Sequence, residues 1–412
     1  MSRTSPEQKE PKLHSRRSLT VAFCVAAGLM LTACAGGKMG SFGQFGNFGG
    51  GNEALQPPAA PAPESNIGTG QVRVGLILPL SAQGNAGIAA QSMKNAAQLA
   101  LAEFKNPNIQ LLVKDDAGTP QGAQAGAQAA LSEGAQIILG PLFAQSVRAA
   151  AQVARPRNIP VIAFSTDSSV ASPGVYLLSF LPETDVKRIV NYATRHRRRS
   201  FAALIPDNAY GSVVQGAFQQ EVPRHHGRIV ALEKYPPDPS RIAGPVRAVA
   251  QVASRVDSIF IPDGADAVPQ VVRALAADHV NLRRVKLLGT GLWDDPRIFQ
   301  DKQMQGGWYA APESKGFRNF SARYRTRFGQ DPVRTATLAY DAVALVAALV
   351  KTQGAHPFTA HILTNSSGFA GIDGIFRFKR DGTNDRGLAV MQVTPTGGRV
   401  ISPAPKAFGP GT

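Results

Sequence analysis

From residue 72 onward, the chain alternates short apolar runs with longer amphipathic stretches. The runs have the length of buried strands, and the stretches between them have the length and period of helices. This repeated alternation predicts an α/β fold in which parallel sheets carry helices on both faces. The apolar runs occupy residues 72–78, 109–113, 136–139, 160–164, 201–205, 229–233, 258–261 and 285–288.

Two apolar crossings divide these elements into two groups of strands. Residues 176–182 follow the first group, and residues 306–311 follow the second. We therefore predict two Rossmann-like lobes with parallel sheets, joined by several hinge crossings. The predicted boundaries place residues 72–181 and 308–372 in lobe I, and residues 182–307 and 373–405 in lobe II.

Helix boundaries and the last elements are also predicted by particular residues. Thr119-Pro120 is typical of an N-cap followed by a first-turn proline, and Gly134 is typical of the end of that helix. Thr184 or Asp185 is expected to cap the helix after the first crossing. Towards the C-terminus we expect an arginine- and aromatic-rich helix over 317–328, a helix over 335–351, and a hairpin around residues 381–382.

The first 33 residues have the three-part layout of an export signal. Basic residues at Lys12, Arg16 and Arg17 precede an apolar segment over 19–33, which is too short to span a bilayer as a mature helix. The adjacent arginines give a weak hint of a twin-arginine signal. We expect residues 1–33 to be a signal peptide.

Cys34 ends the tetrapeptide Leu-Thr-Ala-Cys, which resembles a bacterial lipobox. The resemblance implies cleavage before Cys34 and acylation of its thiol and amine. The alternative is an ordinary secretory signal with a chance cysteine. Ala35 is similar to the residue that sorts enterobacterial lipoproteins to the outer membrane, so we expect a lipid-anchored, periplasm-facing protein, with the outer membrane favoured over the inner.

Residues 34–71 are predicted to form a flexible tether. Phe-Gly pairs recur over residues 42–49, and a Pro/Ala-rich stretch follows over 57–63. About 36 residues of this composition have an r.m.s. reach of roughly 30 to 35 Å. The folded part is therefore expected to stand off the membrane.

Cysteine usage and motif content exclude several kinds of chemistry. Cys24 lies in the removed segment and Cys34 is acylated, so the mature chain has no free thiol or disulfide. The sequence lacks G-x-S-x-G, H-E-x-x-H, P-loop and G-x-G-x-x-G motifs. His225-His226 lies among arginines, which favours a solvated surface over a metal site. We expect no enzyme activity, no metal and no other cofactor.

The formal net charge of +16 has its densest runs at residues 195–199, at Arg283-Arg284 and along residues 323–327. A basic protein attracts polyanions, but export removes nucleic acid as a partner. Residues 195–199 end a predicted helix, where cations suit the helix dipole. The alternatives are contacts with anionic lipid, cell-wall polymer or an acidic partner.

Six short motifs carry a resemblance to a known family. They are Val-Gly-Leu-Ile-Leu-Pro-Leu-Ser over 74–81, Ile-Leu-Gly-Pro-Leu over 138–142, Ile-Pro-Val-Ile-Ala-Phe-Ser over 159–165, Asp-Asn-Ala-Tyr-Gly over 207–211, Phe-Gly-Gln-Asp-Pro over 328–332 and Ala-Tyr-Asp-Ala-Val over 339–343. In this order they resemble the type I periplasmic binding-protein fold of branched-chain amino-acid receptors, over about residues 72–395. Residues 139–142 and 306–309 are similar to the lipoprotein branch that includes activators of penicillin-binding proteins.

Ligands of open parallel sheets bind beyond the carboxyl ends of the strands, where turns and helix N-termini present unpaired N–H groups. The candidate ligand-binding residues in these turns are Ser81, Ser146, Ser165, Thr166, Asp167, Tyr210, Asp263 and Trp293.

The resemblance suggests roles for several of them. Ser165 and Thr166 match the turn that offers hydroxyl and N–H groups to a ligand carboxylate, with helix capping as the alternative. Tyr210 matches a frequent cleft aromatic, with wall packing as the alternative. Asp263 is a candidate for holding an ammonium group or for capping a helix, and Trp293 for closing over a solute or packing at a hinge.

The leading hypothesis is a lipid-anchored periplasmic solute-binding protein that recognises a small polar, amino-acid-like solute and passes it to a membrane permease. The runner-up is an activator of peptidoglycan synthases, which keeps the fold and uses its surface. Partners are therefore a small polar solute, a permease or a peptidoglycan synthase, and the membrane through Cys34, with no nucleic acid.

Overall fold

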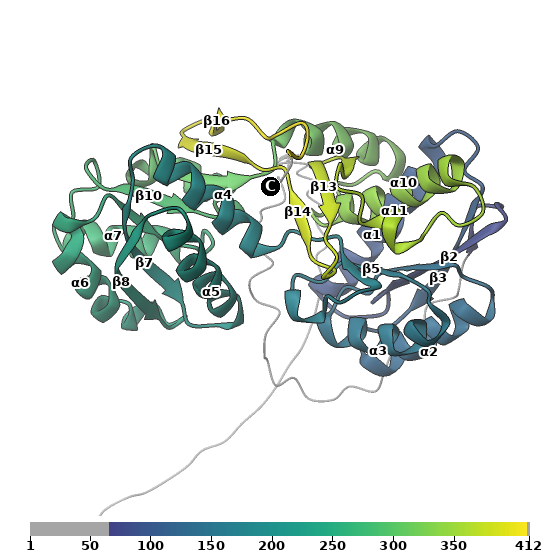
Figure 1. Cartoon of the computed structure of the whole chain (residues 1–412). Helices are drawn as coiled ribbons and strands as arrows, with labels where there is room; N and C mark the ends of the chain where they lie inside the picture. Colours follow the sequence, from purple (N-terminus) through teal and green to yellow (C-terminus); the bar gives the residue numbers. More distant parts are fainter. Residues whose placement is uncertain (1–65, 410–412) are drawn as a thin grey trace, which may run out of the picture. The chain divides into compact units, whose positions relative to one another are not determined.

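The computed structural model describes residues 66–409 (Figure 1). Internal contacts divide the chain into the units Met1–Met39 and Gly40–Thr412, and the described residues all belong to the second. The predicted signal peptide, Cys34 and most of the tether lie outside the described residues. No helix in the described part of the chain has the length and apolar character needed to cross a bilayer.

The first lobe is built on a six-stranded sheet with the order β1-β3-β2-β4-β5-β6. The strands are β1 (Asn66–Ile67), β2 (Val72–Leu78), β3 (Ile109–Asp115), β4 (Ile137–Leu139), β5 (Val161–Ala163) and β6 (Val175–Leu177). All pairings are parallel except that of β1 with β3. Because the inner strands are buried on both faces, their sequences are nearly continuous apolar runs.

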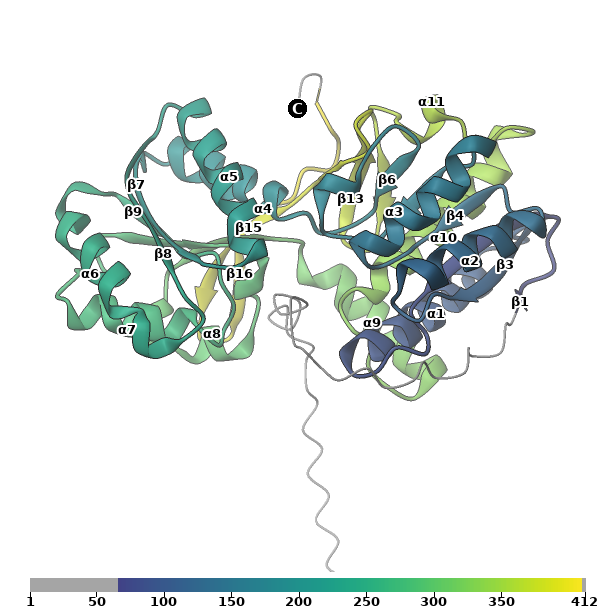
Figure 2. The same cartoon turned by 90° about the horizontal axis from the view of Figure 1, so that it is seen from below.

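Helices cover both faces of this sheet. Helices α1 (Asn85–Glu103) and α10 (Ala336–Gln353) pack on one face, where Met93 is fully buried. Helices α2 (Pro120–Ser132) and α3 (Ala144–Ala154) pack on the other. Figures 1 and 2 show α2 and α3 together on the side of the sheet away from α10.

The second lobe is built on a seven-stranded sheet with the order β16-β15-β11-β10-β9-β7-β8. The strands are β7 (Ser200–Pro206), β8 (Arg228–Tyr235), β9 (Ser258–Phe260), β10 (Lys286–Gly289), β11 (Trp308–Ala311), β15 (Ala389–Thr394) and β16 (Gly397–Ser402). Strands β7 to β11 are parallel, whereas β15 and β16 pair antiparallel. The amino ends of five strands therefore share one edge of this sheet, and their carboxyl ends share the other.

Two groups of helices bury the faces of the second sheet. One face is covered by α4 (Pro182–Arg195) and α5 (Ala209–Arg224). The other is covered by three helices: α6 (Ala243–Val252), α7 (Val268–Ala277) and α8 (Pro296–Gln300). The rings of Phe218 on α5 and Phe260 on β9 stack at 4.8 Å, which anchors α5 to the sheet.

After β11, the chain returns to the first lobe before it forms β15 and β16. Its elements are α9 (Ser314–Phe328), α10, α11 (Ala360–Leu363) and the antiparallel strands β12 (Phe369–Gly371), β13 (Gly374–Phe378) and β14 (Asn384–Arg386). Phe376 and Phe378 belong to the first-lobe core. The N–H of Leu177, at the end of β6, donates to Gly382 O at 2.8 Å.

Each predicted apolar run overlaps a strand, and the predicted fold class is confirmed. Three boundaries differ. Strand β11 pairs with β10 and β15 and so belongs to the second lobe, whereas residues 374–386 pack on the first. Strand β1 lies inside the predicted tether. These differences arise because strand pairing is a non-local property that an apolar run does not specify.

The two predicted helix starts have different outcomes. Thr119 caps α2 as expected, since its hydroxyl accepts the Gly122 N–H at 3.0 Å. The expected cap of α4 is wrong: this helix begins at Pro182, after Leu181, and has no side-chain cap. Proline at the first position supplies a favourable φ and has no N–H to satisfy, so Asp185 is left for another contact.

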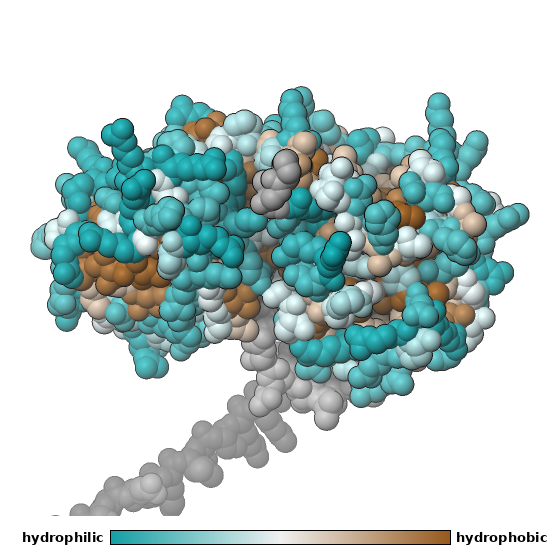
Figure 3. All heavy atoms as spheres, viewed as in Figure 1, coloured by the Kyte–Doolittle hydropathy of each residue, from teal (hydrophilic) through white to brown (hydrophobic). Residues whose placement is uncertain are grey.

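The surface seen in Figure 3 is mainly hydrophilic, with separate hydrophobic areas between polar side chains. Among the described residues, the large hydrophobic side chains with the greatest exposure are Ile88 at 60% and Val400 at 41%.

Candidate functional site

The carboxyl ends of the parallel strands form one polar wall on each lobe. In open parallel sheets these ends are where ligands bind. The first-lobe wall comprises the turns after β2 to β5. The second-lobe wall comprises the turns after β7 to β10, together with the first turn of α4.

The turn after β5 contains three of the expected residues. Ser165 is 4% exposed, and its hydroxyl accepts the Asp167 N–H at 3.1 Å. Thr166 is exposed. The Asp167 carboxylate caps the short helix η3 (Ser168–Val170) by accepting the Ser169 N–H at 2.9 Å, and it forms a 3.7 Å ion pair with Arg148. Arg148 thus offsets the charge that an anionic solute would meet at Asp167.

Ser81 lies in the turn after β2 and contacts the turn after β3. Its N–H donates to Asp115 Oδ1 at 3.2 Å, which joins the turns after β2 and β3. Ser146 is fully buried, and its hydroxyl donates to Thr119 O at 3.2 Å. Its expected role as a solute ligand is therefore wrong, because the side chain is enclosed within the wall.

Asp116 lies against Ser146 and is also fully buried. Burial raises the pKa of its carboxyl to about 6, although the hydrogen bond from the Gly118 N–H opposes the shift. One oxygen, Oδ1, accepts the Gly118 N–H at 2.9 Å. The carboxyl shapes the turn before α2 and does not face a solute.

Two helix N-termini at this wall have no side-chain cap. Helix α1 follows Gly84, whose φ is 64°, and helix α3 follows Phe143. Neither has an acidic residue in its first turn. The exposed N–H groups of such helix starts favour an anion such as a carboxylate. The sequence signal, which we did not use, is the absence of Ser, Thr, Asp or Asn at these N-cap positions.

The second-lobe wall contains two hydrogen-bonded pairs of side chains. The hydroxyl of Tyr210, in the first turn of α5, lies 2.9 Å from the buried hydroxyl of Thr290 after β10. Tyr235, at the end of β8, donates to Asp263 Oδ2 at 2.6 Å. Burial raises the pKa of Tyr210 and of Asp263. Both residues keep part of their surface exposed, as a solute-facing wall requires.

Asp185, which the sequence suggested as a possible helix cap, also belongs to this wall. Its Oδ2 accepts the Gly291 N–H at 2.9 Å, across 106 residues of sequence. The residue is partly exposed, and protein atoms surround most of its carboxyl. Burial, opposed by the Gly291 N–H and reinforced by Glu183, raises its pKa to about 7.

Trp293 has a structural role. It is fully buried, and its indole N–H donates to Ile261 O at 3.1 Å. A Cβ on Gly289 would lie 2.1 Å from the indole ring, so only glycine fits at the end of β10. The expectation that Trp293 closes over a solute is wrong, because the ring packs beneath the wall.

The crossing segments touch both walls. The Ser168 hydroxyl donates to Glu183 Oε1 at 2.6 Å, which connects η3 to the start of α4. Arg386 is 6% exposed and donates from Nε to Ser179 O at 2.9 Å. Its guanidinium lies 4.6 Å from the centre of the Phe180 ring. Movement of the crossing segments would therefore change the positions of residues in the candidate site.

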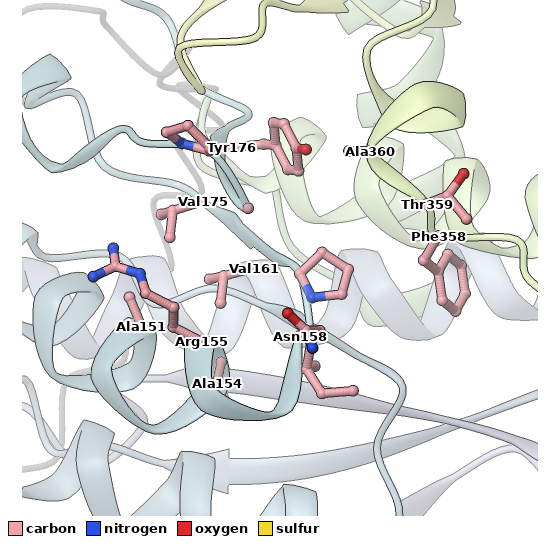
Figure 4. Close-up of a pocket in the computed structure, with 14 residues that line it drawn as sticks. Ala151, Ala154, Arg155, Asn158, Val161, Val175, Tyr176, Phe358, Thr359 and Ala360 are labelled. Atoms are coloured by element: carbon pink, nitrogen blue, oxygen red, sulfur yellow. The ribbon is translucent and has the colours of Figure 1, made fainter.

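A cavity of about 340 Å³ lies elsewhere in the first lobe (Figure 4). Its lining includes Arg155, Asn158, Tyr176 and Thr359. These residues surround the amino ends of β5 and β6, the edge opposite to the candidate wall. In the described chain, no three His, Cys, Asp or Glu side chains gather in a way that would hold a metal ion.

The two lobes together have the type I periplasmic binding-protein fold. The chain belongs to the periplasmic binding protein family, which it matches over residues 71–399.

Solved structures of the same fold have low sequence identity to this chain. A putative branched-chain amino acid ABC transporter protein from Rhodospirillum rubrum is 20% identical, with a TM-score of 0.72, over 80% of this chain and 99% of that one. A solute-binding protein from Rhodopseudomonas palustris, in complex with 3,4-dihydroxybenzoic acid, is 21% identical, with a TM-score of 0.57, over 81% and 98%. An uncharacterised Rickettsia prowazekii protein is 21% identical over 187 residues, and the match spans about half of each chain.

Proposed function

We propose that this chain is a lipid-anchored, non-enzymatic binding protein of the periplasm, which captures a small amino-acid-like solute for an ABC permease. The carboxylate of the solute binds the first-lobe wall, and its ammonium or hydroxyl groups bind the second. Family membership supports the general role, and the two walls support the class of solute.

One observation carries the proposal. Asp185, Tyr210 and Asp263 come from three different elements, keep part of their surface exposed, and are held in place by hydrogen bonds from neighbouring elements. Carboxylates and hydroxyls held in this way accept hydrogen bonds from an ammonium group without reorganising. Such a wall is preorganised for binding.

The first-lobe wall complements the opposite end of the same solute. The uncapped starts of α1 and α3 supply N–H groups, Thr166 supplies an exposed hydroxyl, and Arg148 offsets Asp167. The Rhodospirillum protein is named for branched-chain amino acids and the Rhodopseudomonas protein is in complex with a benzoic acid, and both kinds of compound are carboxylic acids. We therefore place the carboxylate of the solute at this wall.

Thermal shift tests the solute-binding role. A ligand that binds only the folded chain at a hundredfold excess over Kd adds about 2.7 kcal/mol of stability. We expect at least one stabilising compound among amino acids and aromatic carboxylic acids. The double variant Asp185→Asn/Asp263→Asn should lose this shift, whereas the matched control Asp278→Asn should keep it. A shift that survives in the double variant would place the solute elsewhere.

Anchoring is tested separately through Cys34. Wild-type chain should incorporate labelled fatty acid in a bacterial host, and Cys34→Ser should incorporate none while its folded part keeps the same melting temperature. Label in the variant, or none in the wild type, would contradict the lipoprotein proposal.

A further inference from the structure

The amino ends of the second-lobe strands form a surface with an unusual charge. Four stretches, residues 195–199, 224–228, 253–257 and 281–286, precede β7, β8, β9 and β10. Because these strands are parallel, the four stretches meet at one edge of the sheet. Hydrogen bonds hold them together: Arg228 N–H donates to Arg199 O at 2.8 Å, and Lys286 N–H to Asp257 O at 2.9 Å. We call this surface the basic end.

Eight arginines of the basic end have exposed side chains. They are Arg195, Arg197 and Arg199, then Arg224 and Arg228, then Arg255, and finally Arg283 and Arg284. Arg224 pairs with Glu221 at 2.8 Å, and the other seven have no carboxylate within 4.0 Å in the described part of the chain. Their charge is therefore not neutralised within the lobe.

The one acidic residue in these stretches, Asp257, does not neutralise the charge of the exposed arginines. Asp257 Oδ2 accepts the N–H groups of Arg199 and Ser200, each at 3.0 Å, and the Ser200 hydroxyl at 2.7 Å. The carboxylate is thus used to join two turns. Beside this carboxylate, a hollow of about 210 Å³ opens between Arg199, His226 and Arg228. Guanidinium groups such as those of the two arginines bind phosphate through pairs of hydrogen bonds.

An aromatic side chain, Trp308, lies at the same edge of the sheet as the basic end. Trp308 begins β11 at the same edge of the sheet and is partly exposed. Its ring packs edge-on against Tyr192 at 5.2 Å, and Lys286 Nζ lies 4.8 Å from the centre of the ring. Tryptophan beside a basic side chain is typical of protein surfaces at the headgroup level of a membrane.

We propose that the basic end docks on the anionic headgroups of a lipid bilayer. Each arginine near such a surface strengthens binding by roughly fivefold, so several together add a substantial second attachment to a lipid anchor. A protein partner is less well matched, because the most exposed large hydrophobic side chains of the described chain, Ile88 and Val400, lie outside these stretches. The proposal goes beyond solute binding and does not depend on it.

The test uses the unlipidated chain from Ala35 onward, which contains both sheets and every described hydrophobic cluster. Co-sedimentation with phosphatidylcholine vesicles is compared with and without phosphatidylglycerol. We expect binding only to the anionic vesicles, and its loss at high salt. The variant Arg197→Glu/Arg199→Glu/Arg228→Glu should bind at least about tenfold more weakly.

A matched control separates the location of the charge from its amount. Lys315, Arg318 and Arg327 are exposed on α9 of the first lobe. Reversing all three to Glu changes the net charge equally and should leave vesicle binding near that of the wild type. Equal losses in both triple variants would overturn the proposal. So would an absence of vesicle binding in a chain that binds soluble polyphosphate or an acidic protein. The thermal shift with solute, measured on the same variants, reports on the proposed function independently.

Discussion

The two ends of the second sheet have opposite chemistry although they belong to the same strands. At the carboxyl end, Asp185, Asp263 and Tyr210 present partly buried acidic and hydroxyl groups, each held by a hydrogen bond. At the amino end, seven of the eight exposed arginines have no carboxylate partner among the described residues. The first arrangement suits the small solute that we propose, held in a fixed geometry, whereas the second suits the proposed anionic surface, which makes little geometric demand.

This contrast shows how one core supports two independent surfaces. The strands between the ends are buried and carry the stability of the lobe, while the loops at each end carry charge. Substitutions at the two ends should therefore differ in kind: those at the carboxyl end should change stability, pH dependence and solute affinity, and those at the amino end should change association and little else.

The largest expected effect comes from removing the side chain that supports the carboxyl end. Trp293→Ala should reduce the free energy of unfolding by about 3–5 kcal/mol, because it empties a fully buried site beneath the second-lobe wall. Urea denaturation measures the loss. Trp293→Phe keeps most of the packing and should retain solute binding. Solute binding that disappears in Trp293→Phe, with stability intact, would restore Trp293 as a solute contact.

The next effect is a pH dependence that only the carboxyl end should have. The pKa of Asp185 is about 7 in the folded chain, against an ordinary value of 3.8. Between these values the folded state holds a proton that the unfolded state has released. The free energy of unfolding therefore falls as pH rises from about 4 to about 7, and then levels off. Partial exposure reduces the contribution of Asp185 to about 2 kcal/mol.

Asp185→Asn should make this slope smaller, since the amide oxygen still accepts the Gly291 N–H but does not titrate. The buried carboxyls of Asp341, with a pKa raised to about 7, and Asp116, with a pKa raised to about 6, contribute the remaining slope. Denaturation at several pH values measures it. Solute affinity should rise as pH increases through about 7, because the charged carboxylate binds an ammonium group better. An unchanged slope in Asp185→Asn would show that this carboxyl is not buried as described.

The fold was predictable because its signals are local. Buried parallel strands are apolar along their whole length, so the runs at 72–78 and 201–205 indicate β2 and β7 directly. The Thr119 cap is set by a contact three residues away. The lobe boundaries were not predictable in this way, because they depend on which strands pair: β11 lies between β10 and β15, and β15 comes about 80 residues later in the chain.

The candidate site was predicted only in part, for the same reason. Its position at the strand ends follows from the fold, and Tyr210 and Asp263 are on the second-lobe wall as expected. The role of Asp185 depends on Gly291, which no nearby residue indicates. For Trp293, the sequence suggested a ligand contact because the residue lies in a turn. The packing of its ring against Gly289 is visible only in the structure.

A smaller effect is expected from the hydroxyl pair at the centre of the carboxyl end. Tyr210→Phe removes one partner of the 2.9 Å contact with Thr290 and should lower the free energy of unfolding by about 1 kcal/mol. Thr290→Val and the double variant complete a thermodynamic cycle. We expect a coupling energy of roughly 0.5 to 1.5 kcal/mol, and additive losses would show that the two hydroxyls do not interact.

The smallest effect on stability is expected at the amino end. Reversal of Arg197, Arg198 and Arg199 to Glu should change the free energy of unfolding by less than about 0.5 kcal/mol per residue, because exposed charges contribute little. The same variant, expressed in a strain lacking the native chain, distinguishes between the uses of the two ends. If the chain is a solute receptor, solute uptake should persist in this variant and be lost in Ser165→Ala/Tyr210→Ala, since only the latter alters the walls. If the deletion strain itself instead shows normal uptake and reduced peptidoglycan synthase activity, that result would favour regulation of cell-wall synthesis. The arginine surface, not the strand-end walls, would then be the functional region of the molecule.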